Sequence, residues 1–216
     1  MGDKLLEKIK SSAEVYNLTG SVGNDLKLKV MREALGRKIV CKVANKEMEI
    51  YLTAFVQIDL NIRPVSTVIS GEKEVVDEGD DIHLVCSSGG ARPAAVITWY
   101  NGSLSNPLIL PPARHISSLQ EDGTYATISQ LVITADRHHN NNMLYCQATN
   151  EVTQNHIQDQ ERAKYQLRVR YRPAVQVMER WIAVNQSDQV SVSCAYQANP
   201  HQLLGVEWFH NKIWLT

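Results

Sequence analysis

Alternating apolar and polar residues recur through the middle of the chain and predict β-strands there. Residues 81–86 and 143–148 each place Ile, Leu, Ala or Cys at every second position, so that these side chains share one face of a strand. Residues 127–133 form another alternating segment of similar length. Short strands of this kind, separated by turn residues, predict an all-β protein.

The strand pattern repeats along the chain with a period of about 105–109 residues. The matched pairs are Leu26 and Leu131, Leu28 and Ile133, Arg32 and Arg137, Cys41 and Cys146, Asn45 and Asn150, Cys86 and Cys194, and Arg63-Pro64 and Arg172-Pro173. A period of this length is that of an immunoglobulin-type β-sandwich. The sequence therefore predicts tandem immunoglobulin-like sandwiches.

Proline marks the expected joints between successive sandwiches. Arg63-Pro64 and Arg172-Pro173 each follow an alternating segment, and proline cannot donate a hydrogen bond to a sheet ladder. We therefore expect the C-terminal part of one domain at residues 17–63, a complete domain at 64–172 and the N-terminal part of a third at 173–216.

The first 16 residues follow no strand pattern of an immunoglobulin domain. Leu5, Leu6 and Ile9 would form an apolar stripe on a helix between Lys4 and Glu14. We expect residues 1–16 to be an atypical segment that is helical or disordered, as at the incorrect beginning of a partial gene product.

Two cysteines and a tryptophan of residues 64–172 have the spacing of an immunoglobulin core. Trp99 follows Cys86 by thirteen residues, and Cys146 lies in a later strand. This pattern predicts a disulfide between Cys86 and Cys146 that joins two sheets beside a buried indole. Leu144 stands where many such domains have the tyrosine of a tyrosine corner, so we expect that hydrogen bond to be absent. The disulfide implies an oxidising compartment.

The other two cysteines belong to the incomplete copies. Cys41 matches the second cysteine of the core and Cys194 the first, so we expect each to be unpaired through truncation. In the third copy, Val190 and Val192 precede Cys194 on the expected strand face, and Trp208 is the expected core tryptophan.

Composition and motifs argue against several functional classes. The formal net charge of −1, with both signs mixed along the chain, argues against a nucleic-acid partner. Neither a signal peptide nor an apolar run long enough to span a membrane is present. We find no catalytic or cofactor-binding motif, so we expect a protein that is not an enzyme and has no small-molecule substrate. His138-His139 is interpreted as a polar turn rather than a metal site.

Three sequons are candidate N-glycosylation sites on surface loops. Their acceptors are Asn17, Asn101 and Asn185, and Asn101 is expected in the turn that follows the Trp99 strand.

Three stretches of the sequence resemble the Sidestep family of invertebrate cell-surface proteins, and more broadly nephrin-type and nectin-type adhesion molecules. They are LGRKIVCKVAN (35–45) with DLNIRP (59–64), SSGGARPAAVITWY (87–100), and QANP (197–200) with VEWFHN (206–211). The resemblance implies a single-pass membrane protein whose immunoglobulin domains lie on the extracellular face. It also implies heterophilic binding to Beaten-path-type immunoglobulin receptors in axon guidance.

Two other functions remain open at this stage. One is homophilic adhesion of the nectin or nephrin kind. The other is a structural spacer that holds a distal binding domain away from the membrane and contacts no partner itself.

Overall fold

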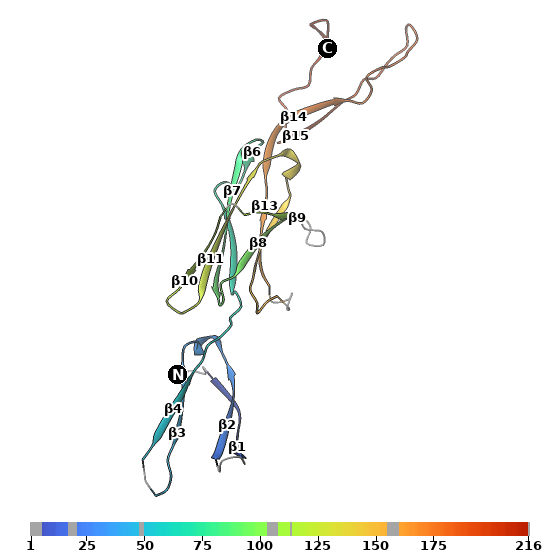
Figure 1. Cartoon of the computed structure of the whole chain (residues 1–216). Coiled ribbons are helices and arrows are strands. Elements are labelled where there is room, and N and C mark those ends of the chain that lie inside the picture. Colours follow the sequence, from blue (N-terminus) through green and yellow to red (C-terminus); the bar gives the residue numbers. More distant parts are fainter. Residues whose placement is uncertain are drawn as a thin grey trace.

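The computed structural model describes residues 6–16, 21–47, 50–102, 108–112, 114–154 and 160–215. Their regular structure consists of β-strands and two short 3₁₀ helices, which confirms the predicted all-β class. Figure 1 shows a complete sandwich in the middle of the molecule, with a smaller group of strands at either end.

The middle sandwich is built from two antiparallel four-stranded sheets. The first sheet has the order β10-β11-β7-β5, with the bounds β5 (Ser66–Gly71), β7 (Asp81–Ala91), β10 (Arg114–Leu119) and β11 (Tyr125–Thr134). The second has the order β13-β12-β8-β9, with the bounds β8 (Val96–Asn101), β9 (Leu108–Leu110), β12 (Met143–Thr149) and β13 (Glu161–Gln166). The short strand β6 (Val76–Asp77) pairs in parallel with the start of β14 (Val169–Val177).

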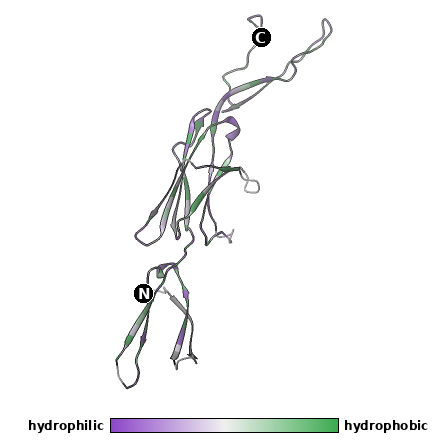
Figure 2. Cartoon of the chain, viewed as in Figure 1, coloured by the Kyte–Doolittle hydropathy of each residue, from purple (hydrophilic) through white to green (hydrophobic). Residues whose placement is uncertain are grey.

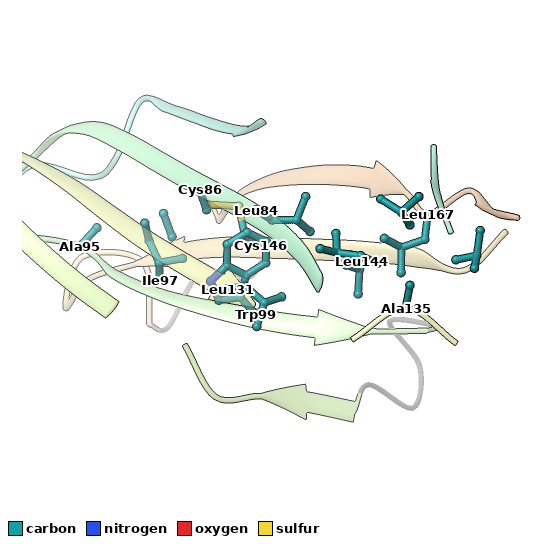
Figure 3. Packing of buried hydrophobic residues seen from close by; sticks show 14 of the residues in the cluster. Leu84, Cys86, Ala95, Ile97, Trp99, Leu131, Ala135, Leu144, Cys146 and Leu167 are labelled. Carbon is teal, nitrogen blue, oxygen red and sulfur yellow. A yellow bond between two sulfur atoms is a disulfide. The ribbon is translucent and has the colours of Figure 1, made fainter. Parts of the chain in front are cut away.

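The core of the middle sandwich lies around the predicted disulfide and tryptophan (Figure 3). Cys86 and Cys146 are bonded, with their Cα atoms 6.5 Å apart, and neither residue has measurable exposed surface. Trp99 is fully buried, and its indole N–H donates to the Ser129 hydroxyl at 3.0 Å. The hydrogen bond leaves the ring in apolar surroundings while its one polar group is satisfied. The predicted disulfide is confirmed.

Leu144 occupies the position of the tyrosine corner, and the tyrosine beside it lies outside the core. The Leu144 side chain is fully buried in the core, and Tyr145 lies on the opposite face of β12, where it is half-buried. Side chains on a strand alternate between the two faces, so the residue after Leu144 cannot enter the same core.

Four strands precede the middle sandwich and form what we call the back half-sandwich. They are β1 (Leu6–Tyr16), β2 (Ser21–Val30), β3 (Lys38–Val43) and β4 (Leu52–Gln57), with the 3₁₀ helix η1 (Arg32–Ala34) between β2 and β3. β1 pairs with β2, and β3 pairs with β4.

The helix or disorder expected for residues 1–16 is wrong where the structure describes them. Residues 6–16 form strand β1, which pairs with β2 along its whole length apart from one irregularity between Lys8 and Lys10. An apolar stripe of three residues is a weak helix signal, and cross-strand hydrogen bonds to β2 outweigh it. Residues 1–5 lie outside the described part of the chain.

The back half-sandwich repeats the later strands of the middle sandwich in detail. Cys41 pairs with Ala54 across β3 and β4, just as Cys146 pairs with Ala163 across β12 and β13. The turns before β3 and β12 also match, because Gly36 and Asn141 both have positive φ, at 72° and 65°. Glycine and asparagine are the residues that adopt this conformation most readily.

The strands after the middle sandwich form what we call the front half-sandwich. They are the second part of β14, β15 (Cys194–Asn199), β16 (Trp208–His210) and β17 (Ile213–Leu215). Trp208 pairs with Leu215 across β16 and β17, as Trp99 pairs with Leu110 in the middle sandwich.

The strand expected over Val190, Val192 and Cys194 begins only at Cys194. The matching residues of β7 form a strand because they pair with β11, for example Leu84 with Leu131. No described strand lies in the place of β11 in the front half-sandwich. The backbone hydrogen bonds that would define this part of the strand are therefore missing.

Candidate interaction surfaces

The joint between the back half-sandwich and the middle sandwich is fixed by backbone pairing and by Arg92. Ile62 and Arg92 form an isolated antiparallel bridge across the joint. The Arg92 guanidinium also reaches the Asp59 carboxylate at 3.0 Å and donates to the Gly123 carbonyl at 2.9 Å. Arg92 therefore ties residues on both sides of the joint to one planar group.

Two further side chains hold backbone carbonyls at this joint. Arg32, at the start of η1, donates to the carbonyl oxygens of Gly90 and Arg63 at 2.8 and 2.9 Å. Asn150 is 5% exposed, and its amide donates to the Ile62 carbonyl at 2.7 Å and to that of Pro93 at 3.2 Å. Side chains that bind backbone carbonyls on both sides of the joint restrict how the two units can rotate against each other.

The second joint has no separate linker, because β14 passes directly from one unit into the next. Its first residues pair with β6 of the middle sandwich, and its later residues pair with β15. The Asn199 amide donates to the Val169 carbonyl at this crossing, at 2.6 Å. Nearby, Arg137 binds Glu78 through two hydrogen bonds of 2.7 and 2.8 Å, and these bonds lower the pKa of the Glu78 carboxyl.

The outer face of the second sheet of the middle sandwich carries a row of large side chains. The register places Ile109 beside Tyr100, Tyr100 beside Tyr145, and Tyr145 beside Lys164, across strands β9, β8, β12 and β13. Ile109 and Lys164 are exposed, and both tyrosines are half-buried. We call these four residues the tyrosine row. Tyrosine supplies a large contact area and a hydroxyl at little conformational cost, which suits a protein-binding surface.

Sequence reasoning assigned no role to the tyrosine row or to the side chains that hold the joints. The signal for the row was present, because Tyr100 follows the buried Trp99 and Tyr145 precedes the buried Cys146. Neighbours of buried strand residues must point to the outside of the sandwich. Asn150 appeared as a repeat match without a role, and nothing in the pattern indicated Arg92.

The residues expected to be unpaired through truncation are not buried. Cys41 is exposed and Cys194 is half-buried, and neither forms a disulfide. Trp208 is 38% exposed, whereas its counterpart Trp99 has no exposed surface. In Figure 2, green segments mark apolar residues along the β3–β4 hairpin, which carries Cys41.

The two sequon asparagines that the structure describes differ in accessibility. Asn185 is exposed in a turn, where its N–H donates to the Asp188 carboxylate at 3.2 Å. Asn101 is not in the expected turn but is the last residue of β8, and it is half-buried with an enclosed side-chain oxygen. Asn17 lies outside the described residues.

We therefore expect Asn185 to be glycosylated to a higher occupancy than Asn101, because the acceptor amide must reach the glycosylating enzyme. Mass spectrometry of the chain secreted from eukaryotic cells, before and after enzymatic removal of N-glycans, measures both occupancies. Asn185→Gln should then remove more glycan mass than Asn101→Gln. A higher occupancy at Asn101 would contradict this expectation.

The histidine pair lies in the predicted polar turn. Arg137, His138 and His139 form the 3₁₀ helix η2, which Asp136 caps by accepting a hydrogen bond from the His138 N–H at 2.8 Å. In the described part of the chain, no three His, Cys, Asp or Glu side chains are grouped as metal ligands would be. That part also contains no helix of the length and apolarity needed to cross a membrane.

Comparison with known proteins finds a family model that matches the middle sandwich and several relatives of the chain at low identity. Residues 66–156 match the model of the CD80-like C2-set immunoglobulin domain. Schwann cell myelin protein of Coturnix japonica is 28% identical over 206 residues, which cover 93% of this chain and 28% of that protein. Cell adhesion molecule 4 of Homo sapiens is 26% identical over 140 residues, or 64% of this chain and 34% of that protein.

A third relative is the Irregular chiasm C-roughest protein of Drosophila melanogaster, which is 25% identical over 167 residues. These residues cover 67% of this chain and 21% of that protein. The chain thus spans only about a third, or less, of the length of the relatives that it matches.

Solved structures support the same fold. The full ectodomain (Ig1–Ig3) of mouse nectin-like molecule 4 has a TM-score of 0.55 and 19% identity, covering 93% of this chain and 63% of that one. Rst D1-D2 has a TM-score of 0.52 and 22% identity, covering 74% of each chain. The middle sandwich therefore has an immunoglobulin fold that matches the C2-set model, and the relatives of the chain include proteins named as cell adhesion molecules.

Proposed function

We propose that this chain is a recognition segment of a cell-surface adhesion protein and that it binds another immunoglobulin-superfamily protein outside the cell. The disulfide of the middle sandwich supports an extracellular location, because such bonds persist in oxidising surroundings. The relatives named as cell adhesion molecules support the adhesive role. We expect the protein to act by binding rather than by catalysis.

The binding that we propose is heterophilic, to a Beaten-path-type immunoglobulin receptor, as in the Sidestep family. The three stretches that resemble this family lie at the joints and in the core strands, so they support the domain type and order. In this proposal the whole protein is a single-pass membrane protein that acts in axon guidance.

The observation that carries the proposal is the tyrosine row on the outer face of the middle sandwich. Ile109, Tyr100 and Tyr145 form an apolar and aromatic strip that ends at the charged Lys164. Interfaces between proteins combine an apolar, aromatic centre with a polar rim, and tyrosines are frequent among their energetically dominant residues.

Replacing both Tyr100 and Tyr145 by alanine tests this assignment. We expect the affinity for a Beaten-path-type receptor ectodomain to fall at least tenfold, because truncating one dominant interface tyrosine costs about 2 kcal/mol. Surface plasmon resonance with the immobilised chain measures the affinity. The matched control is Ile128→Ala, which removes an exposed apolar side chain from the outer face of the first sheet. Equal effects of the two changes would contradict the assignment.

The second candidate is homophilic adhesion. Lys164 is the only charged residue of the tyrosine row, so two copies could place their rows together with little electrostatic repulsion. Beads coated with the chain distinguish the candidates. Clustering of the beads with one another, without binding of the receptor, would favour homophilic adhesion.

The third candidate, a spacer, is favoured by the side chains that hold the joints. Binding to neither partner, with no effect of the tyrosine changes in the whole protein, would support this role.

A further inference from the structure

A run of exposed basic side chains extends along β13 and the start of β14. Between residues 162 and 172, the odd-numbered side chains face the core of the middle sandwich and the even-numbered ones face solvent, as the alternation of a strand requires. The inward residues are Ala163, Tyr165, Leu167, Val169 and Tyr171. All six outward residues are exposed, and five of them are basic: Arg162, Lys164, Arg168, Arg170 and Arg172. We call these five residues the basic row.

The basic row is linear, because β14 follows β13 along the side of the middle sandwich (Figure 1). Strand residues advance by about 3.3 Å each, so the two ends of the row lie roughly 30 Å apart. Residues 162–172 include no Asp or Glu, although the whole chain has a formal net charge of −1. The near neutrality of the whole chain therefore does not extend to this edge of the sandwich.

Neighbouring carboxylates leave most of the charge of the basic row uncompensated. Arg170 binds the Asp77 carboxylate through two hydrogen bonds of 2.7 and 2.9 Å. Arg162 donates to the neutral side chain of Gln160 at 3.1 Å. Among the residues that the structure describes, no carboxylate forms an ion pair with the other four members of the row. The row therefore presents several positive charges in a line to the solvent.

This arrangement suits a linear polyanion better than a broad anionic surface. A guanidinium group donates two parallel hydrogen bonds to a tetrahedral oxyanion such as a sulfate. A sulfated polysaccharide carries such groups along one extended chain, as the row carries its arginines along one edge, whereas a membrane presents a plane of charge. Segments rich in Lys and Arg are a known signal for heparin binding.

We propose that the basic row binds a sulfated glycosaminoglycan of the heparan sulfate class. The proposal rests on the proposed function for the extracellular location, where such polysaccharides are found. Lys164 also ends the tyrosine row, so the polysaccharide lies along the edge of the surface that we assign to the protein partner. The middle sandwich thus has two neighbouring binding surfaces of different chemistry.

A double variant of the full chain, Arg162→Gln with Arg168→Gln, tests the proposal. Surface plasmon resonance on immobilised heparin is expected to show binding at least about tenfold weaker, because one basic residue at an anionic surface contributes about fivefold. Binding of the unaltered chain should also weaken more steeply with salt than that of the variant, because more counterions are released. The matched control, Arg37→Gln with Arg114→Gln, removes two exposed arginines outside the row and should bind heparin like the unaltered chain.

Three results would overturn the proposal. The first is an unaltered chain that does not bind heparin in about 0.15 M salt, where long-range attraction is already screened. The second is an equal loss of binding in the two double variants, which would mean that net charge alone drives it. The third is binding to vesicles that contain phosphatidylserine without binding to heparin, which would make a membrane the occupant of the row.

Receptor binding is measured separately, because neither Arg162 nor Arg168 belongs to the tyrosine row. The affinity of the first double variant for a Beaten-path-type receptor ectodomain should equal that of the unaltered chain. Heparin binding that depends on the basic row, in a chain that binds no receptor, would support this proposal while contradicting the proposed function.

Discussion

Trp99→Ala is expected to lower the unfolding free energy of the middle sandwich by about 3–5 kcal/mol, the range for removing a fully buried aromatic side chain. Trp99 has no exposed surface and lies beside the Cys86–Cys146 disulfide (Figure 3). The change leaves a cavity between the two sheets and deprives the fully buried Ser129 hydroxyl of the indole hydrogen bond. Because domain stabilities are typically 5–15 kcal/mol, this loss is a large fraction of the whole.

Hydrogen exchange of the amides in β7 and β12 of the full chain measures this loss. The matched control is Trp208→Ala, because Trp208 has the same place in the front half-sandwich and is 38% exposed. The control should leave the protection of β7 and β12 unchanged. Full protection of these strands in Trp99→Ala would mean that the indole is not part of their packing.

The fold of the middle sandwich could be predicted because its signals are local and strong. Strands such as β7 place buried residues at every second position, and the cysteine and tryptophan spacing fixes which strands face each other. The repeat then extended this assignment to both ends of the chain. Leu26 and Cys41 could be placed in strands because their repeat matches, Leu131 and Cys146, lie in predicted strands of the middle sandwich.

The predictions were wrong where the structure of a segment depends on its pairing with another strand. Residues 6–16 have a weak helical stripe, and only pairing with β2 makes them a strand. Val190 and Val192 have the strand pattern, but no described strand takes the place of β11 beside them. In both cases backbone hydrogen bonding between strands decides the structure, and a single alternating pattern does not contain that information.

The residues at the first joint could not be predicted for a related reason. Asn150 reaches the carbonyl of Ile62, which lies 88 residues earlier in the chain, and Arg32 reaches that of Gly90, 58 residues later. Every residue has a backbone carbonyl, so the residue types in the sequence do not indicate which carbonyl a side chain will bind. The repeat singled out position 150, but only the structure shows that its side chain binds backbone carbonyls at the joint.

Asn150→Ala is expected to destabilise the first joint and its adjoining turn by about 1–3 kcal/mol, because the buried amide is lost and its partners are left without their hydrogen bonds. The Asn150 amide donates to the carbonyls of Ile62 and Pro93, and its side-chain oxygen accepts from the Val152 N–H at 3.2 Å. The Ile62 carbonyl also accepts from the Arg92 N–H at 2.8 Å, so the loss falls mainly on Pro93 and Val152.

Two further substitutions separate the role at the joint from the role in the turn. Asn150→Asp keeps the acceptor for the Val152 N–H but turns a carboxylate toward two carbonyl oxygens, so it should loosen the joint while the turn remains. Lys46→Ala changes an exposed residue in the corresponding turn of the back half-sandwich and should cost less than about 0.5 kcal/mol. Thermal unfolding measures stability, and small-angle X-ray scattering measures how widely the two units move. If Asn150→Asp scatters like the unaltered chain, the backbone bridge and Arg92 hold the joint without the amide, and Asn150 serves only its own turn.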